Sequence, residues 1–215
     1  DPRSAYYSDP GDFDSVYVEN KIDFTDAESF GDVGTGMTGN YNGMLVAWQE
    51  RSIWTISGSL NVIGTTPDFN RRRTSAQTGT VHHRTVLRIP SGAKYLDAVG
   101  ELQETKEVML AYLTPLKDIR LFDGDNDIVI SHPKSATLNT LNYTHRGKCH
   151  ACLFTSFGLA VWYFPASAAT ECDTAVAWDY QRGIWYEFTG QNFASVVEIE
   201  SSSTAATIVG SETRV

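Results

Sequence analysis

Residues 43–48 (GMLVAW) and 52–58 (SIWTISG) decide the fold of this chain. Both are short apolar runs that carry aromatic and β-branched residues, which favour β-strands. The polar residues 49–51 separate them and the second run ends in a turn. Together these residues predict a pair of antiparallel strands.

The same arrangement recurs twice along the chain. Residues 108–113 form an apolar run that is followed by 118–124, which ends in the turn dipeptide Asp-Gly. Residues 158–164 form the third copy, followed after a longer break by 174–179 and 183–188. Repetition of one strand unit indicates a fold that is built from repeats.

The spacing of the repeats predicts their architecture. The marker aromatics Trp48, Tyr112 and Trp162 lie 64 and then 50 residues apart, close to the roughly 40 to 50 residues of a β-propeller blade once an insertion is allowed for. We expect an all-β fold, a β-propeller with about four blades in this chain, either complete or part of a larger propeller. The approximate blades of this single domain (1–215) are 1–58, 59–135, 136–190 and an incomplete 191–215.

Composition limits the functional classes. The 215 residues carry a net charge of -9, which argues against binding duplex DNA through its phosphates. No apolar run reaches 18 residues, so no membrane-spanning helix is expected. The chain begins at Asp1 without a methionine or an apolar leader, and we expect a processed chain or a piece of a longer one.

Three cysteines raise the question of a metal site. Cys149 and Cys152 have the Cys-x-x-Cys spacing of zinc ligands, with histidines beside them, but the second pair of ligands is missing and Cys172 lies twenty residues away. Residues three apart in a strand face opposite sides. We therefore expect free thiols of a reducing compartment, with no metal and no other cofactor.

Residues 123–127 (DGDND) offer a second ion-binding pattern. Asp123, Asp125 and Asp127 are spaced as in a calcium loop, but Ile128 stands where an EF-hand needs glycine and Lys134 where it needs glutamate. The same residues suit a tight hairpin turn. The turn is the favoured interpretation, and an ion site stays the alternative.

A basic segment stands out against the acidic chain. Arg71, Arg72 and Arg73 are followed by the His82-His83-Arg84 run and by Arg88. Such a patch could bind phosphate or an acidic partner. The simpler interpretation, which we favour, is a solvated loop between blades, and the stretch 59–80, which holds the arginine triplet, is predicted to be irregular.

The segment 178–185 (WDYQRGIW) is predicted to be a folding element. Asp179 is expected to cap the turn and Trp185 to pack between units. Gly-x-Ser-x-Gly, glycine-rich phosphate loops and His-Glu-x-x-His are all missing from the sequence. We predict no catalytic, cofactor-binding or metal site, and no enzymatic activity.

Several short motifs resemble the β-propeller of tailed-bacteriophage virion proteins, especially the tail nozzle or hub proteins of short-tailed phages. They are 7–12 (YSDPGD), 43–58 with its SIWTISG strand, 118–124 (DIRLFDG), 130–131 (IS) and 179–185. The pattern departs at 78–80, where Thr-Gly-Thr replaces a common Gly-Cys turn. The motifs span nearly the whole chain, although each is short.

The resemblance implies a structural component of a bacteriophage tail. Copies of the chain would form a ring that lines or surrounds the DNA-ejection channel, contacts the tail adaptor or connector, and anchors fibres or spikes. DNA would pass without specific binding, and an acidic channel would repel its phosphates. The location would be the virion tail, after assembly in the host bacterial cytoplasm.

Two other functions are compatible with a propeller. A receptor- or glycan-binding module would stack sugars on exposed aromatics at the blade mouths, for which Tyr6, Tyr7, Trp162 and Tyr163 are candidates. The simpler interpretation of these four is core between blades. A propeller hydrolase would need paired carboxylates in the central funnel, and no pair stands out among the 26 acidic residues.

Overall fold

The computed structural model describes residues 3–8, 14, 16–17, 20–25, 31–59, 68–190, 192–200 and 205–210. Within these, strands dominate and pair into antiparallel sheets, which confirms the all-β prediction. Helix is limited to short pieces: α1 (Ser135–Leu138) and the 3-10 turns η1 (His83–Thr85), η2 (His132–Lys134) and η3 (Tyr143–Lys148). No helix in the described ranges is long and apolar enough to cross a membrane.

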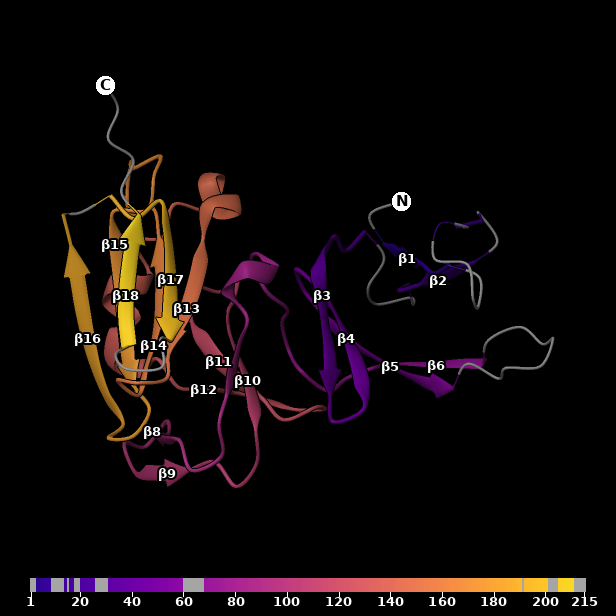
Figure 1. The fold of residues 1–215 in the computed structure, drawn as a ribbon, viewed down its shortest axis with the longest axis horizontal. Helices are drawn as coiled ribbons and strands as arrows, with labels where there is room; N and C mark the ends of the chain where they lie inside the picture. The colour runs from indigo at the N-terminus through magenta and orange to yellow at the C-terminus, as the bar shows by residue number, and fades with distance from the viewer. Residues whose placement is uncertain are drawn as a thin grey trace.

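Three four-stranded sheets form the body of the molecule, and each is a meander of strands in chain order (Figure 1). The first sheet contains β3 (Gly34–Tyr41), β4 (Met44–Gln49), β5 (Ile53–Ser59) and β6 (Asp68–Arg73). The second contains β7 (Leu87–Ile89), β10 (Met109–Leu113), β11 (Ile119–Phe122) and β12 (Asp127–Val129). The third contains β13 (His150–Phe154), β14 (Leu159–Phe164), β15 (Thr174–Asp179) and β16 (Ile184–Thr189).

Three hairpins complete the described strands. The first is β1 (Ser4–Tyr6) with β2 (Lys21–Asp23), the second β8 (Lys94–Leu96) with β9 (Leu102–Glu104), and the third β17 (Ser195–Glu200) with β18 (Ala205–Gly210). The β1–β2 and β17–β18 hairpins lie at opposite ends of the long axis in Figure 1. They form the outer layers of a stack whose three middle layers are the four-stranded sheets.

The repeat unit predicted from the marker aromatics is present. Trp48, Tyr112 and Trp162 all lie on the second strand of their sheet: β4, β10 and β14. The β8–β9 hairpin is inserted between the first and second strands of the second sheet, and this insertion lengthens the first spacing. Of the predicted units, the boundary at 58/59 cuts the end of β5 and separates this strand from β6, with which it pairs in one sheet.

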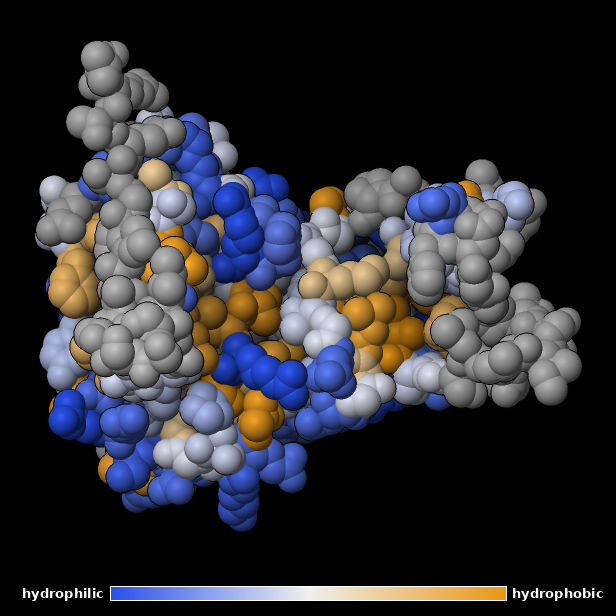
Figure 2. Space-filling view, viewed as in Figure 1, coloured by the Kyte–Doolittle hydropathy of each residue, from blue (hydrophilic) through white to orange (hydrophobic). Residues whose placement is uncertain are grey.

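Alternation along each second strand explains how the layers hold together. In β10, Leu110 and Tyr112 pack with Trp48 of the first sheet, whereas Ala111 and Leu113 pack with Trp162 of the third. The rings of Trp48 and Tyr112 are 4.9 Å apart between centroids. Both faces of a middle sheet are therefore buried, as its continuous apolar runs require. Figure 2 shows apolar surface along the middle of the molecule, between polar flanks.

One prediction from the sequence is wrong and one interpretation is confirmed. The stretch 59–80 is not irregular throughout, because Asp68–Arg73 forms β6 and pairs with β5. Its polar side chains hide the strand from a search for apolar alternation, and charged residues are common on edge strands. Trp162 and Tyr163 are buried between layers, at 0% and 5% exposure, which confirms the simpler interpretation of these two as core residues, and they offer no platform for sugars.

Candidate functional site

The first strands of neighbouring sheets lie close together and form one shared edge of the stack. The η1 turn contacts β3 on one side and β13 on the other, and β13 also contacts β7 and β17. The segment that runs through η1 into β7 therefore occupies the middle of this edge. It carries four basic side chains, which makes it the strongest candidate site in the described chain: His82, His83, Arg84 and Arg88.

Each arginine of this segment reaches a backbone carbonyl of a neighbouring layer. Arg84 donates from its guanidinium to the Gly147 carbonyl at 2.6 Å, and Arg88 donates to the Asn40 carbonyl at 3.1 Å. Neither arginine forms an ion pair with any residue that the structure describes. The two guanidinium groups thus leave positive charge on an acidic molecule, where an anionic group could be held.

His82 caps the turn that presents these arginines. Its Nδ1 accepts a hydrogen bond from the Arg84 amide at 3.2 Å, as expected of an N-cap acceptor. Burial lowers the pKa of His82 to about 4, helped by the neighbouring charges of His83 and Arg84. The imidazole is therefore neutral at pH 7 and able to accept this bond.

Buried hydroxyl groups fix the turn to the sheets beneath it. Thr80 Oγ1 lies 2.9 Å from both Thr85 Oγ1 and the Leu113 carbonyl. The Thr85 carbonyl in turn accepts from the indole N–H of Trp162 at 2.9 Å. Since these groups belong to the second and third sheets, the basic edge is held in a fixed position between layers.

Other basic residues near this edge are neutralised. Arg146 donates from Nε and from a terminal nitrogen to Glu50 Oε1, at 3.0 and 2.7 Å, and its guanidinium lies 4.5 Å from the Tyr143 ring centroid. Lys148 pairs with Glu171. Glu50 and Arg146 are 96 residues apart, so nothing in the local sequence indicated that pair.

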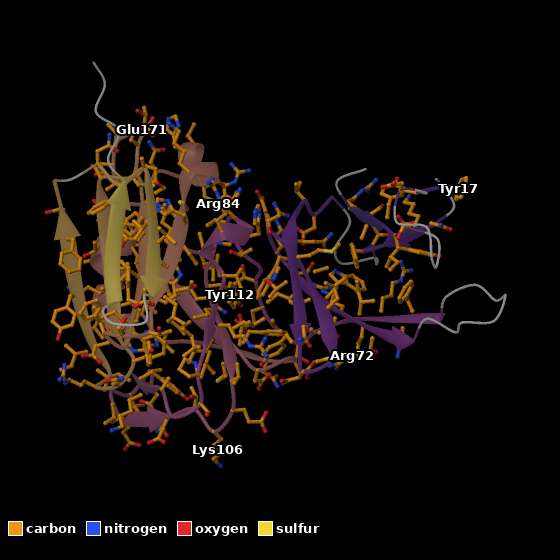
Figure 3. All side chains as sticks on the ribbon, viewed as in Figure 1. Tyr17, Arg72, Arg84, Lys106, Tyr112 and Glu171 are labelled. Carbon is orange, nitrogen blue, oxygen red and sulfur yellow. The ribbon has the colours of Figure 1, made fainter. Side chains whose placement is uncertain are left out.

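The structure separates the two halves of the predicted basic patch. Arg71, Arg72 and Arg73 lie on β6, the last strand of the first sheet, and not in a solvated loop. Arg72 pairs with Asp125 at 2.8 Å. Figure 3 shows Arg72 and Arg84 on opposite sides of the molecule. Arg72 therefore belongs to a contact between the first and second sheets, and the triplet does not extend the η1 edge.

Residues 123–126 form the hairpin turn between β11 and β12, and Asp127 begins β12. Asp123 accepts from the amides of Asp125 and Asn126 at 2.8 and 2.7 Å, the pattern of an Asx-turn. Asp125 faces Arg72, and Asp127 faces Arg120 and Tyr112. The three carboxylates thus each bind donors of the chain itself, in support of the turn interpretation.

A buried charge network beneath this turn was not predicted from the sequence. Arg120 is 7% exposed and lies 3.0 Å from both Asp118 and Asp127. Burial opposes its charged form, yet these hydrogen bonds and charges raise the Arg120 pKa. The Tyr112 hydroxyl donates to Asp127 at 2.9 Å, and burial together with the Asp127 charge raises its pKa. The signal that could have revealed the network was a charged residue inside the apolar run 119–122.

The cysteines do not converge on a metal site. Cys149 packs in the core between the second and third sheets, whereas Cys152 packs on the opposite face of the third sheet. Cys172 Sγ lies 3.9 Å from His150 Nδ1. Burial raises the pKa of Cys149, and that of Cys172 to about 12. In the described ranges no three His, Cys, Asp or Glu residues are placed to hold a metal ion.

The predicted role of the 178–185 segment is confirmed. Asp179 accepts from the amides of Gln181 and Arg182 at 3.1 and 3.0 Å and caps the turn. The Trp185 ring stacks on Trp178 at 6.0 Å between centroids, within the core shared by the second and third sheets. Asp179 thus holds the turn, and Trp185 serves packing.

Comparison with known proteins adds no family. No protein-family model matches the chain, and no curated protein shows a significant match to its sequence.

Proposed function

We propose that the stacked sheets are blades of a β-propeller and that the chain is a structural component of a bacteriophage tail. In this role copies form a nozzle- or hub-like ring around the DNA-ejection channel and hold adaptor, fibre or spike proteins. The observation that carries the proposal is the stack itself: three meanders packed face to face, with their first strands along one edge. Propeller blades pack in this way around an axis.

The positions of the phage-like motifs support the proposal. The SIWTISG run provides β5, the DIRLFDG run provides β11 and its turn, and the Asp179–Trp185 run connects β15 to β16. All three lie in the later strands of their sheets, away from the edge formed by the first strands, and they contribute to contacts between layers. A rigid stack of this kind suits a scaffold, whose partners bind at loops and edges.

The basic edge gives the proposed ring a place for an acidic partner. Arg84 and Arg88 are exposed on rigid elements and have no carboxylate partner among the described residues. An adaptor or fibre surface that carries aspartate or glutamate would fit them. In this proposal DNA only passes through the channel without specific binding, because the net charge of -9 opposes tight binding to phosphates.

The test is mass spectrometry of purified phage particles and of the isolated native chain. The proposal predicts that the chain is present in several copies per particle and that particles without it fail to deliver DNA. A chain that is absent from every particle would overturn the proposal. Sharp, saturable binding on a glycan array would then favour the receptor-binding module.

A further inference from the structure

The two end hairpins cover different parts of the sheets on which they pack. At the amino-terminal end, Ala5 of β1 and Ile22 of β2 pack on Trp54 and Ile56 of β5. The Tyr7 ring lies 5.1 Å from Phe69 of β6. This hairpin therefore covers the later strands of the first sheet and reaches Leu45 and Ala47 of β4. Met37 of β3, on the same face, is 44% exposed.

At the other end the β17–β18 hairpin covers the early strands of the third sheet. Val196 packs with Phe154 and Tyr163, and β17 contacts β13. The Glu198 carboxylate accepts from the amide of Thr155 at 2.7 Å and from that of Ser156 at 3.2 Å, in the turn after β13. The hairpin is thus fixed over β13 and β14.

The later strands of that face remain open and apolar. Ile184, Tyr186 and Phe188 alternate along the edge strand β16 and are 47%, 41% and 49% exposed. Tyr186 and Phe188 are in register with Ala177 and Ala175, which belong to the core on this face. Figure 2 shows apolar surface at this end of the molecule, where β16 lies in Figure 1.

A groove connects this open strip to the covered half. It has a volume of about 230 Å³, and its walls are apolar or aromatic side chains. Phe154, Leu159 and Val161 form its floor, and Phe157 and Phe188 stand at its open side, with Phe157 58% exposed. An exposed apolar strip of this kind indicates a missing partner.

We propose that the β1–β2 hairpin of a second copy occupies this groove and extends the β17–β18 hairpin into a four-stranded layer. Three four-stranded layers precede this one, and the two hairpins supply the complementary halves of a fourth: early strands from one, later strands from the other. The hairpins lie at opposite ends of the long axis (Figure 1), so a neighbouring copy can join them where one molecule cannot.

Strand alternation assigns the contact. Ala5 packs on its own first sheet, and the next residue, Tyr6, is 44% exposed at the rim of this contact, where a second copy can reach it. In the proposed layer Tyr6 of one copy enters the groove beside Phe188 of the next, and strand pairing along β18 supplies main-chain hydrogen bonds. The contact is head-to-tail, which closes into a ring or continues as a filament. This inference deepens the ring of the proposed function and rests on that part of it.

The test uses the full chain with Phe188→Asp at one end, Tyr6→Asp at the other, and Leu116→Asp as the control. Leu116 is 61% exposed in the turn between β10 and β11, away from both ends. Sedimentation velocity should show concentration-dependent association for the native chain and the control. Each end variant alone should weaken association at least about tenfold, as loss of a central apolar contact does.

Mixing the two end variants distinguishes a head-to-tail contact from misfolding and from a two-fold interface. Each variant retains one intact end, so an equimolar mixture should form a dimer that grows no further, which neither an unfolded variant nor a two-fold interface would do. A monomeric native chain, an unaffected Phe188→Asp variant or a mixture without dimer would overturn the inference. Presence in phage particles is read separately, so either proposal can fail alone.

Discussion

At the scale of single residues, the stability of the fold is highly sensitive to substitution in the buried network around Arg120. The guanidinium neutralises Asp118 and Asp127 in a site where it is 7% exposed. We expect Arg120→Met to lower the free energy of unfolding by about 3 to 5 kcal/mol, because it leaves Asp127 buried without its cation. Urea denaturation measures this. The matched control is Arg72→Met, whose pair with Asp125 is exposed and contributes less than about 1 kcal/mol. Equal losses in the two variants would refute a special role for the network.

His82 gives a pH dependence of known sign. Its pKa is lowered from 6.5 to about 4 in the folded chain, first by burial, so the unfolded chain binds the extra proton at a higher pH. The free energy of unfolding should therefore fall as the pH drops from 6.5 to 4, and this contribution should then level off. His82→Asn keeps a capping oxygen and should flatten the profile in that window. An unchanged slope in urea titrations of the variant would contradict the assignment.

At the scale of elements, the connection from β6 to η1 depends on one glycine. A Cβ on Gly79 would lie 1.8 Å from the Gln49 carbonyl oxygen, and the neighbouring amides of 79 and 80 bond to the Glu50 and Gln49 carbonyls. Gly79→Ala must displace the backbone, and we expect it to lower the free energy of unfolding by about 1 to 3 kcal/mol, measured by urea or thermal denaturation. Gly39→Ala is the control, because a Cβ there meets no atom within 4 Å. Comparable stability of the two variants would show that the segment relaxes freely.

The apolar strands could be predicted from the sequence, whereas the polar strand β6 and the contacts of the basic edge could not. The apolar runs carrying Trp48, Tyr112 and Trp162 indicated the repeat, because burial on both faces requires continuous apolar strands. β6 was missed because its Arg71–Arg73 run has no apolar alternation. The candidate edge was noticed only as the charge run His82–Arg88. Two features of this edge could not be predicted: its distance from Arg72, and the carbonyl groups that Arg84 and Arg88 bind. Both depend on how distant segments of the chain pair, and a local sequence pattern does not contain that information.

At the scale of the whole molecule, the apolar core between the first and second sheets is separate from the core between the second and third. Trp48 is 1% exposed and packs on Tyr112 and Phe122 of the second sheet, and the third sheet lies beyond that contact. Stability should therefore behave as a sum of layers and interfaces, as in repeat proteins. Trp48→Ala leaves a cavity at the first interface, with an expected cost of about 3 to 5 kcal/mol. Trp162→Ala does the same at the second interface.

Hydrogen exchange of the amides can separate these interfaces. In Trp48→Ala, amides of β4, β5 and β10 should lose protection while those of β14 and β15 keep most of theirs. In Trp162→Ala the loss of amide protection should be greatest in β10, β11 and β14, and the amides of β5 should keep theirs. The two variants serve as controls for each other, since both remove a fully buried tryptophan. Uniform loss across all three sheets in both variants would mean that the stack unfolds as one cooperative unit, as a closed propeller would, and would exclude layer-by-layer stability.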